Sequence, residues 1–207
     1  MKLIIGIPTI NRADLLNEAL ANYFEDFKDT EIVICDNGNQ EIITRERNFV
    51  HYKPEKNLGV SGSWNMLMDY ADKVKATHVL ILNDDIYLGK PEEEIKTIIK
   101  LWNPEFLCTE LNWCSFILSV ETFKKVGNFD ENFFPAYFED NDYFRRMQLA
   151  NVPIIMNPML NPIIYRNSMT IQKSPELNSG FEKNRQYYIS KWGGQPTQET
   201  FATPFNK

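Results

Sequence analysis

Short apolar runs alternate with amphipathic stretches through the first half of the chain. The runs KLIIGI, EIVICDNG and THVLILNDD have the continuous apolar pattern of strands that are buried on both faces. Between them, residues 13–24 and 61–71 repeat apolar side chains with the spacing of a helix that buries one face. Strands that alternate with helices in this way predict an α/β fold with a mostly parallel central sheet.

Two further segments have clear end signals. PEEEIKTIIKLW predicts a helix with Pro91 in its first turn and three glutamates at the positive end of its dipole. Its expected buried face comprises Ile95, Ile98, Ile99 and Trp102. SFILSVETFKKVGNFDE predicts a strand that runs into a short helix, with Ser119 as N-cap and Gly127 as the C-terminal stop.

The chain beyond residue 151 has weaker periodicity. Prolines recur there at positions 153, 158, 162, 175 and 196, which favours an extended, loop-rich arm over regular elements. A chain of 207 residues is long enough for one sizeable core. We therefore expect a single Rossmann-like domain over residues 1–166 and a loop-rich C-terminal arm, residues 167–207, that packs on the same domain.

Charge and cysteine content exclude several classes of protein. The formal net charge is −6, so the phosphate backbone of a nucleic acid is not the expected partner. Cys35, Cys108 and Cys114 form no Cys-x-x-Cys pair, which argues against a disulfide scaffold or zinc ribbon and fits a reducing compartment. The N-terminus lacks the pattern of a signal peptide, and no apolar run approaches the ~20 residues of a membrane span. We therefore expect a soluble, cytoplasmic protein.

Polar residues gather where the three predicted strands end, which is where parallel α/β sheets bind ligands. These positions hold Pro8, Thr9 and Asn11 after the first strand, Asp36 and Asn37 after the second, and Asn83, Asp84 and Asp85 after the third. Asp36 stands where nucleotide-binding folds place a carboxylate against ribose or base. Asp-Asn-Gly is also an ordinary turn former, so a structural role for Asp36 remains open.

Asp84 and Asp85 are adjacent carboxylates that follow an apolar strand. They would repel each other and lose hydration there, and a divalent cation would compensate for both effects. Mg²⁺ or Mn²⁺ takes one or two protein carboxylates and leaves its other positions to water and substrate phosphates. The sequence therefore favours a Mn²⁺ or Mg²⁺ site at this strand end, with a solvated loop as the alternative.

The segment YFEDNDYFRRM, residues 137–147, concentrates three carboxylates within four positions. Asp142 has a structural explanation, because it can pair with Arg146 one helical turn later. Glu139 and Asp140 have none. A carboxylate among aromatic side chains loses hydration, its pKa rises, and it becomes a better base near neutral pH. We therefore expect Asp140, with Glu139 beside it, to act in catalysis.

Three tryptophans differ in their predicted environments. Trp64 and Trp102 fall on the apolar stripes of predicted helices and are expected in the core. Trp113 lies off any stripe. It is either a core residue or a ring that stacks on a sugar.

Taken in order, these segments resemble the metal-dependent, inverting glycosyltransferases of the GT-A fold, in particular the rhamnosyltransferase-like branch of family two. IGIPTINR is similar to the family's P-T-x-N-R opening, IVICDNG to its V-V-D-N-G-S, and NLGVSGSWN to its N-x-G-x-x-x-x-x-N. LNDD resembles its variable D-x-D metal site, VGNFDENFFPAYFEDNDYFRR its G-F-D-E…E-D-x-D segment, and YYISKWGG an ending found in some members.

The resemblance implies a role for each candidate residue. Pro8, Thr9 and Asp36 would hold the nucleoside, with Asn11, Gly59 and Asn65 nearby. Asp85 would coordinate the cation that bridges the diphosphate, and Asn83 and Asp84 would lie near the ribose or the donor sugar. Asp140 would be the general base, with Glu139 shaping the acceptor site. Two departures stand out: Asn83 replaces the first acid of D-x-D, and no histidine follows position 78 to complete the cation site. Asn161 or Asn167 could substitute for that histidine.

The implied activity is transfer of a sugar from a UDP- or dTDP-linked donor to a hydroxyl acceptor during polysaccharide or glycan biosynthesis. Inversion rests on the resemblance, so a retaining transferase stays open. A sugar-phosphate nucleotidylyltransferase is a second alternative, although GIPTINRAD lacks the glycine- and arginine-rich loop of that class. A non-catalytic nucleotide- or carbohydrate-binding module is a third.

Overall fold

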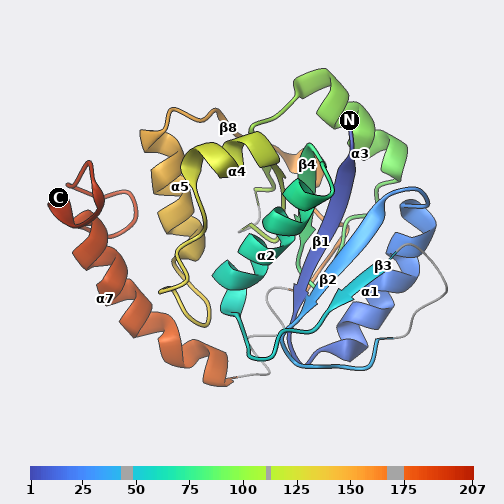
Figure 1. Cartoon of the computed structure of the whole chain (residues 1–207), viewed down its shortest axis with the longest axis horizontal. Coiled ribbons are helices and arrows are strands. Elements are labelled where there is room, and N and C mark those ends of the chain that lie inside the picture. Colours follow the sequence, from blue (N-terminus) through green and yellow to red (C-terminus); the bar gives the residue numbers. More distant parts are fainter. Residues whose placement is uncertain (43–48, 111–112, 167–174) are drawn as a thin grey trace.

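The protein forms three layers, with one mixed sheet between two layers of helices (Figure 1). The computed structural model describes residues 1–42, 49–110, 113–166 and 175–207. Seven strands form the sheet in the order β3-β2-β1-β4-β7-β6-β8. They are β1 (Leu3–Thr9), β2 (Glu31–Asp36), β3 (Phe49–Tyr52), β4 (His78–Leu82), β6 (Phe106–Cys108), β7 (Ser115–Ser119) and β8 (Ile154–Met156).

The sheet is mostly parallel, as predicted. Strand β7 is antiparallel to both of its neighbours, β4 and β6, whereas every other neighbouring pair in the sheet is parallel. The carboxyl ends of β1, β2, β4 and β6 therefore lie at one edge, together with the start of β7. A separate two-stranded sheet pairs β5 (Ile86–Tyr87), which directly follows β4 in the chain, with β9 (Ile164–Tyr165).

Helices cover both faces of the sheet because its strands are apolar on both sides. Helices α1 (Ala13–Asp26) and α3 (Glu92–Trp102) pack on one face. Helices α2 (Gly59–Lys73), α4 (Val120–Val126) and α5 (Glu139–Leu149) pack on the other, which is the near face in Figure 1. The predicted caps of α4 are confirmed, since Ser119 Oγ accepts a hydrogen bond from the Thr122 N–H and Gly127 ends the helix.

The expectation for Trp102 is wrong. Ile95, Ile98 and Ile99 are buried as predicted, but Trp102 is the last residue of α3 and 42% of its surface is exposed. Asn103, in the left-handed conformation, ends the helix directly after Trp102, so the final residue of the apolar stripe lies at the very end of α3. Trp64 is buried as predicted, and Trp113 packs against it with ring centroids 6.0 Å apart. Trp113 therefore belongs to the core cluster.

The C-terminal arm contains more regular structure than its prolines suggested. It includes helix α7 (Phe181–Trp192) and the short 3₁₀ helices η2 (Pro175–Gly180) and η3 (Pro204–Asn206), and η1 (Pro158–Leu160) precedes it. Three of the five prolines counted in this region either begin such an element or follow α7, positions at which proline is compatible with helices. Helix α7 lies beside α5 at one end of the molecule (Figure 1).

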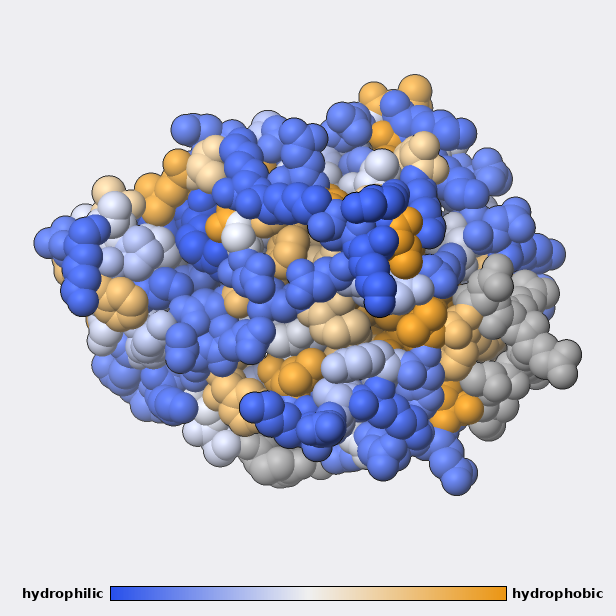
Figure 2. Space-filling view, viewed as in Figure 1, coloured by the Kyte–Doolittle hydropathy of each residue, from blue (hydrophilic) through white to orange (hydrophobic). Residues whose placement is uncertain are grey.

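The molecular surface is largely hydrophilic on the face seen in Figure 2, and apolar residues show mainly in its hollows. Within the described ranges, no helix is long and apolar enough to cross a membrane.

Candidate active site

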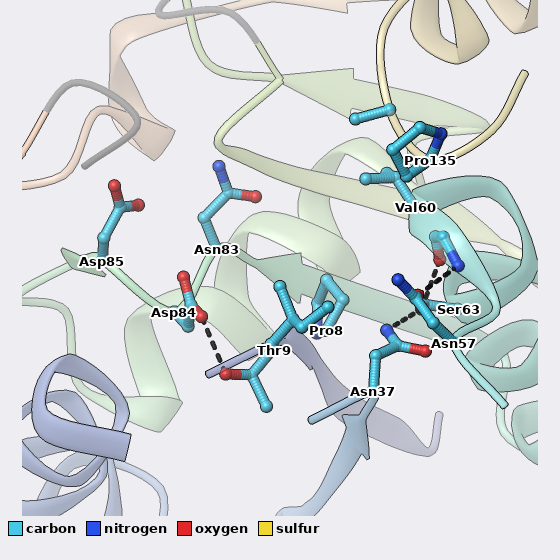
Figure 3. A pocket seen from close by; sticks show the side chains of 13 residues that line it. Pro8, Thr9, Asn37, Asn57, Val60, Ser63, Asn83, Asp84, Asp85 and Pro135 are labelled. Atoms are coloured by element: carbon cyan, nitrogen blue, oxygen red, sulfur yellow. Dashed lines mark hydrogen bonds between the residues drawn. The ribbon is translucent and has the colours of Figure 1, made fainter. Parts of the chain in front are cut away.

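A pocket opens at the carboxyl edge of the sheet, between the ends of β1 and β4 and the start of α2 (Figure 3). The cavity has a volume of about 120 Å³. That is smaller than the ~300 Å³ of a typical small-molecule site, so a larger ligand would extend along the open edge. The lining residues are Pro8, Thr9, Ile10, Asn37, Asn57, Gly59, Val60, Ser63, Asn83, Asp84, Asp85, Pro135 and Ala136.

The ends of β1 and β4 are joined by a buried hydrogen bond. Thr9 Oγ1 donates to Asp84 Oδ2 at 2.7 Å, and Gln40 Nε2 donates to Thr9 Oγ1 at 3.2 Å. Asp84 and Asp85 are only 5% and 2% exposed. The predicted pair of carboxylates therefore lies within the pocket wall, where contact with water is limited.

Arg12 is the cation closest in sequence to the β1 end, and it acts electrostatically on this acidic pair. It is 4% exposed, and its Nε and Nη2 each donate to a carboxylate oxygen of Asp14 at 2.9 Å. The hydrogen bonds that Arg12 donates to Asp14 are the main cause of its raised pKa, and the charges of Asp14, Asp84 and Asp85 raise that pKa further. Arg12 therefore offsets part of the repulsion between the two aspartates.

Asp36 lies beneath the pocket and is not part of its lining. Its carboxylate accepts hydrogen bonds from the backbone N–H groups of Gly38 and Gln40 and from the Gln40 side chain, and it contacts His51 Nε2 at 2.9 Å. Burial alone would raise the pKa of Asp36, but these bonds outweigh burial and lower it. Asp36 therefore holds the turn after β2, and its side chain is fully engaged in doing so.

The start of α2 is fixed by amide and hydroxyl groups in the pocket wall. Asn37 Oδ1 accepts from the Leu58 N–H at 2.8 Å, and Asn37 Nδ2 donates to Ser63 Oγ at 2.8 Å. Asn57 Oδ1 accepts from the Gly59 N–H at 2.8 Å. These polar groups orient the helix N-terminus, whose positive dipole end favours an anionic ligand.

Gly59 allows the loop before α5 to form the opposite wall. Its φ is +68°, and a Cβ atom there would lie 2.8 Å from the Pro135 carbonyl oxygen. The next residue, Val60, donates its N–H to the same oxygen at 2.9 Å. A side chain at position 59 would therefore be strained and would also push the two walls apart.

The structure brings together six of the residues predicted to bind the donor or the cation: Pro8, Thr9, Gly59, Asn83, Asp84 and Asp85. Asn65 lies elsewhere, because it accepts from the Phe129 N–H and donates to the Phe129 carbonyl and to Glu131. Asn11 is exposed, has a φ of 52°, and lies against Gly38. The roles assigned to these residues stay predictions.

Sequence reasoning missed the lining residues Ile10, Asn57, Val60, Ser63, Pro135 and Ala136. Asn57 and Ser63 flank the N-terminus of α2, and a search for polar residues at that helix start would have found them. Pro135 and Ala136 carry no such signal, because they reach the pocket only through the close approach at Gly59.

The residues at the end of β4 could hold a divalent cation if a bound phosphate ligand completes its coordination. Among the residues that the structure describes, no three His, Cys, Asp or Glu side chains form a cluster that could hold a metal. Asp85 and Asp84 supply hard oxygen donors at one point of the pocket, which matches the one or two carboxylates that Mg²⁺ uses when phosphates complete its coordination. Asn161 Oδ1 is occupied by Thr109 Oγ1 and the Glu110 N–H, and Asn167 lies outside the described residues.

Glu139 and Asp140 are the first two residues of α5. Glu139 is 7% exposed and Asp140 is half-buried. Burial raises the pKa of both carboxyl groups, and the charge of Asp140 raises the pKa of Glu139 further. The pair precedes Asp142, which forms the expected ion pair with Arg146 at 2.9 Å. A raised pKa makes a carboxylate a stronger base, which is the property that a proton acceptor needs.

The backbone just before this pair is strained. Tyr137 and Phe138 have φ values of 80° and 71°, which bulky residues rarely adopt. Two consecutive aromatic residues in this region indicate that the surrounding contacts determine the position of Glu139 and Asp140.

Cys108 and Cys114 are buried thiols at one edge of the sheet, since Cys108 ends β6 and Cys114 directly precedes β7. Burial raises the pKa of each thiol to about 12, with smaller contributions from the charge of Asp140 at Cys108 and of Asp85 at Cys114.

Comparison with known proteins agrees with this arrangement. Residues 4–104 match the family model described as glycosyl transferase family 2. No curated protein has a sequence that matches the chain.

Three solved structures share the fold. One is described as a nucleotide-diphospho-sugar transferase from Desulfovibrio desulfuricans G20, with 11% identity, a TM-score of 0.54, and coverage of 89% of this chain and 99% of that one. The catalytic domain of Drosophila beta1,4galactosyltransferase 7, complexed with xylobiose, has 13% identity, a TM-score of 0.53, and coverage of 75% and 64%. GalNAc-T7 with UDP, GalNAc and Mn²⁺ has 12% identity, a TM-score of 0.66, and coverage of 93% and 48%.

The chain thus spans about half of the GalNAc-T7 chain and just under two thirds of the galactosyltransferase chain. At these identities the likeness establishes the fold, and the family match covers β1, α2 and β4, which line the pocket together with Pro135 and Ala136. The protein is a glycosyltransferase of the GT-A fold, and residues 4–104, just under half of the chain, match the glycosyl transferase family 2 model.

Proposed function

We propose that the protein transfers a sugar from a nucleotide-diphosphate donor to an acceptor hydroxyl with inversion at the anomeric carbon. The observation that carries this proposal is a pocket that contains Asp84 and Asp85 and whose lining residues Pro135 and Ala136 lie just before Glu139 and Asp140 in the chain. Burial raises the pKa of both Glu139 and Asp140. Sugar transfer needs both an anion-stabilising site and a base.

The donor side uses the pocket. The nucleoside of a UDP- or dTDP-sugar would lie against Pro8 and Thr9, while Asp36 supports the site from beneath by holding the turn after β2. Asn83 and Asp84 would lie near the ribose or the donor sugar. Asp85 would hold Mn²⁺ or Mg²⁺, which would neutralise negative charge on the diphosphate leaving group. GalNAc-T7 was solved with UDP and Mn²⁺, which supports the same chemistry here.

The acceptor side uses Asp140. The transition state of sugar transfer is oxocarbenium-like, and the attacking hydroxyl becomes acidic as its bond to the anomeric carbon forms. Asp140 would take that proton, and its raised pKa increases the basicity of the carboxylate. Glu139 would shape the acceptor site beside it. The acceptor hydroxyl would belong to a growing glycan, in keeping with a role in polysaccharide or glycan biosynthesis.

A thermal-shift panel of nucleotide sugars, with and without Mn²⁺, tests the donor assignment. A ligand at 100 times its Kd stabilises the folded state by about 2.7 kcal/mol, so the preferred donor should raise Tm clearly and only when Mn²⁺ is present. No shift with any nucleotide or nucleotide sugar would refute the proposal. The anomeric configuration of the product, read by proton NMR, separates inversion from retention.

The three buried free cysteines are consistent with work in a reducing compartment, and we propose a cytoplasmic location.

A further inference from the structure

Asp142, in the first turn of α5, is fully buried and is held by three side chains. Its Oδ1 lies 2.7 Å from Lys191 Nζ and accepts a hydrogen bond from Trp192 Nε1 at 2.9 Å. Its Oδ2 accepts from Arg146 Nε at 2.9 Å. Any movement of the helix start would break these charge-assisted bonds and leave a buried carboxylate unpaired, so the contacts fix the start of α5.

The ammonium of Lys191 also contacts a second carboxylate. Nζ donates to Asp130 Oδ2 at 2.6 Å, and the Tyr187 hydroxyl donates to the same oxygen at 2.9 Å. Lys191 is only 5% exposed, and its Nζ lies 5.5 to 6.0 Å from the ring centres of Phe133, Tyr187 and Trp192. Two cations, Lys191 and Arg146, thus balance two carboxylates in a largely buried site.

Asp130 and Asp142 are the two ends of one segment of chain, and a single ammonium joins them. Between these ends lie Pro135 and Ala136, which line the donor pocket, and Asp140, the proposed base. A cross-link between the ends of a loop restricts the conformations open to every residue within it. We call residues 130–142 the acceptor segment.

Helix α7 also holds the middle of the acceptor segment. Asn184 is fully buried, and its Nδ2 donates to the carbonyl oxygens of Ala136 at 2.8 Å and Tyr137 at 3.2 Å. A Cβ atom on Gly180 would lie 2.7 Å from the Phe134 carbonyl oxygen. At ~100° per residue, positions 180, 184 and 191 fall within about 40° of one another, so they share one face. That face contacts the segment at its middle and, through Lys191, at its ends.

These contacts account for the strained backbone beside the base. The left-handed conformations of Tyr137 and Phe138 persist only when their surroundings over-determine them. The hydrogen bonds from Asn184 hold the carbonyl groups on either side of the first strained residue, and the bond from Lys191 to Asp142 holds the helix that follows.

We propose that Lys191 is a positioning residue, whose ammonium closes the acceptor segment and so sets Asp140 against the donor pocket. The C-terminal helix is therefore part of the catalytic apparatus although none of its residues lines the pocket. The consequence for turnover rests on the proposed function, because it requires Asp140 to be the base. The closure of the segment does not depend on that function.

The test compares four full-length proteins: wild type, Lys191→Met, the charge-balanced Asp130→Asn/Lys191→Met, and Lys183→Met. Lys183 is an exposed lysine of the same helix and serves as the control. Three quantities are measured for each protein: amide hydrogen exchange across residues 130–142, Tm, and the affinity for UDP with Mn²⁺. Turnover of UDP-sugars is then followed by UDP release, with kcat and the donor KM determined separately.

We expect Lys191→Met to lower Tm, to raise exchange in the acceptor segment at least tenfold, and to lower kcat about 10- to 100-fold, since a displacement of ~1 Å costs about that much. Affinity for UDP and the donor KM should change by less than about twofold. The double variant should recover Tm, because no buried charge is left unbalanced, but should recover neither exchange protection nor kcat.

Recovery of protection and kcat together with Tm in the double variant would show that Lys191 acts only by balancing charge, and would overturn the proposal. Unchanged exchange in Lys191→Met would overturn it as well. If the wild type binds no UDP and releases none from any UDP-sugar, the proposed function fails, while the exchange and Tm measurements still decide whether Lys191 closes the segment.

Discussion

The hydroxyl of Thr9 donates to Oδ2 of Asp84 at 2.7 Å, joining two residues that are 75 positions apart in the sequence. The bond exists because β1 and β4 are parallel neighbours, so the residues that follow or end them meet at the same edge. It orients one member of the carboxylate pair at the point where the proposed cation and diphosphate would lie.

We expect Thr9→Val to weaken binding of UDP with Mn²⁺ about tenfold, because Asp84 loses the hydroxyl that orients it, and one such bond is worth ~1 kcal/mol or more. Calorimetric titration measures this. Thr30→Val is the matched control, since Thr30 Oγ1 donates to Glu92 Oε1 at 2.6 Å in an equally buried pair outside the pocket. The control should lose similar stability and keep its UDP affinity; equal losses of affinity in both would contradict the assignment.

Asp85→Asn should remove the dependence of nucleotide binding on Mn²⁺. The amide keeps the shape of the side chain but loses the charge that would hold the cation, so UDP should bind at least ~10-fold more weakly and equally with or without Mn²⁺. Titration of UDP at a series of Mn²⁺ concentrations measures this. Asp72→Asn is the control, because Asp72 pairs with Lys124 away from the pocket. Retention of full Mn²⁺ dependence in Asp85→Asn would rule out the cation site.

Asp140→Asn should lower kcat by ~10²–10⁴ while UDP affinity stays within about twofold, because the proposed base does not contact the nucleotide.

The same change should alter stability in a pH-dependent way. Burial raises the folded-state pKa of Asp140. The ionised carboxylate therefore begins to destabilise the folded state once the pH rises above the unfolded-state pKa, and the full destabilisation is present above the folded-state pKa. The variant should therefore have a higher Tm than wild type at pH 8, and the difference should shrink as the pH falls.

Glu139→Gln should move the acidic limb of the pH–rate profile to lower pH. The limb reports ionisation of the base, and two neighbouring carboxylates resist ionising together, so removal of one lowers the apparent pKa of the other. The profile of kcat/KM between pH 4 and pH 8 measures the shift. A limb that stays in place would mean that Asp140 titrates independently of Glu139.

Much of the fold could be predicted from the sequence, because strands of a parallel sheet that are buried on both faces are continuous apolar runs. The ends of the same runs predict that Thr9, Asp84 and Asp85 lie at one edge of the sheet, and all three line one pocket there. The direction of β7 could not be predicted, because the apolar pattern of SFILS is the same in a parallel and in an antiparallel strand. The prediction that Trp102 is buried is wrong because periodicity identifies the apolar face of a helix but not the length over which that face is covered.

The acceptor side of the site was only partly predictable for a related reason. The carboxylates of YFEDNDYFRRM could be divided into a structural and a catalytic group from local spacing, and the Asp142–Arg146 pair is confirmed. The partners Lys191 and Trp192 lie about 50 residues away, and no local pattern relates them to Asp142. Asp36 and Asn65 show the converse. The strand-end position of Asp36 and the family resemblance for Asn65 predicted ligand contacts, whereas Asp36 bonds to Gln40 and His51 and Asn65 bonds to Phe129 within the protein.

Gly59→Ala should damage the pocket more than its backbone strain alone explains. Gly59 and Gly127 both have positive φ, of 68° and 88°, but a Cβ atom at position 59 would lie 2.8 Å from the Pro135 carbonyl, whereas one at position 127 would meet nothing within 4 Å. Gly127→Ala therefore introduces backbone strain without a steric clash, and its φ of 88° and ψ of 179° put that strain at about 1–3 kcal/mol. Gly59→Ala adds a clash to the strain of a positive φ, so it should also weaken UDP binding about tenfold, because the wall formed by Pro135 and Ala136 must move. Chemical denaturation and UDP titration of both variants measure the two effects. Equal stability losses with unchanged UDP affinity would mean that the two walls are free to separate without consequence for the donor.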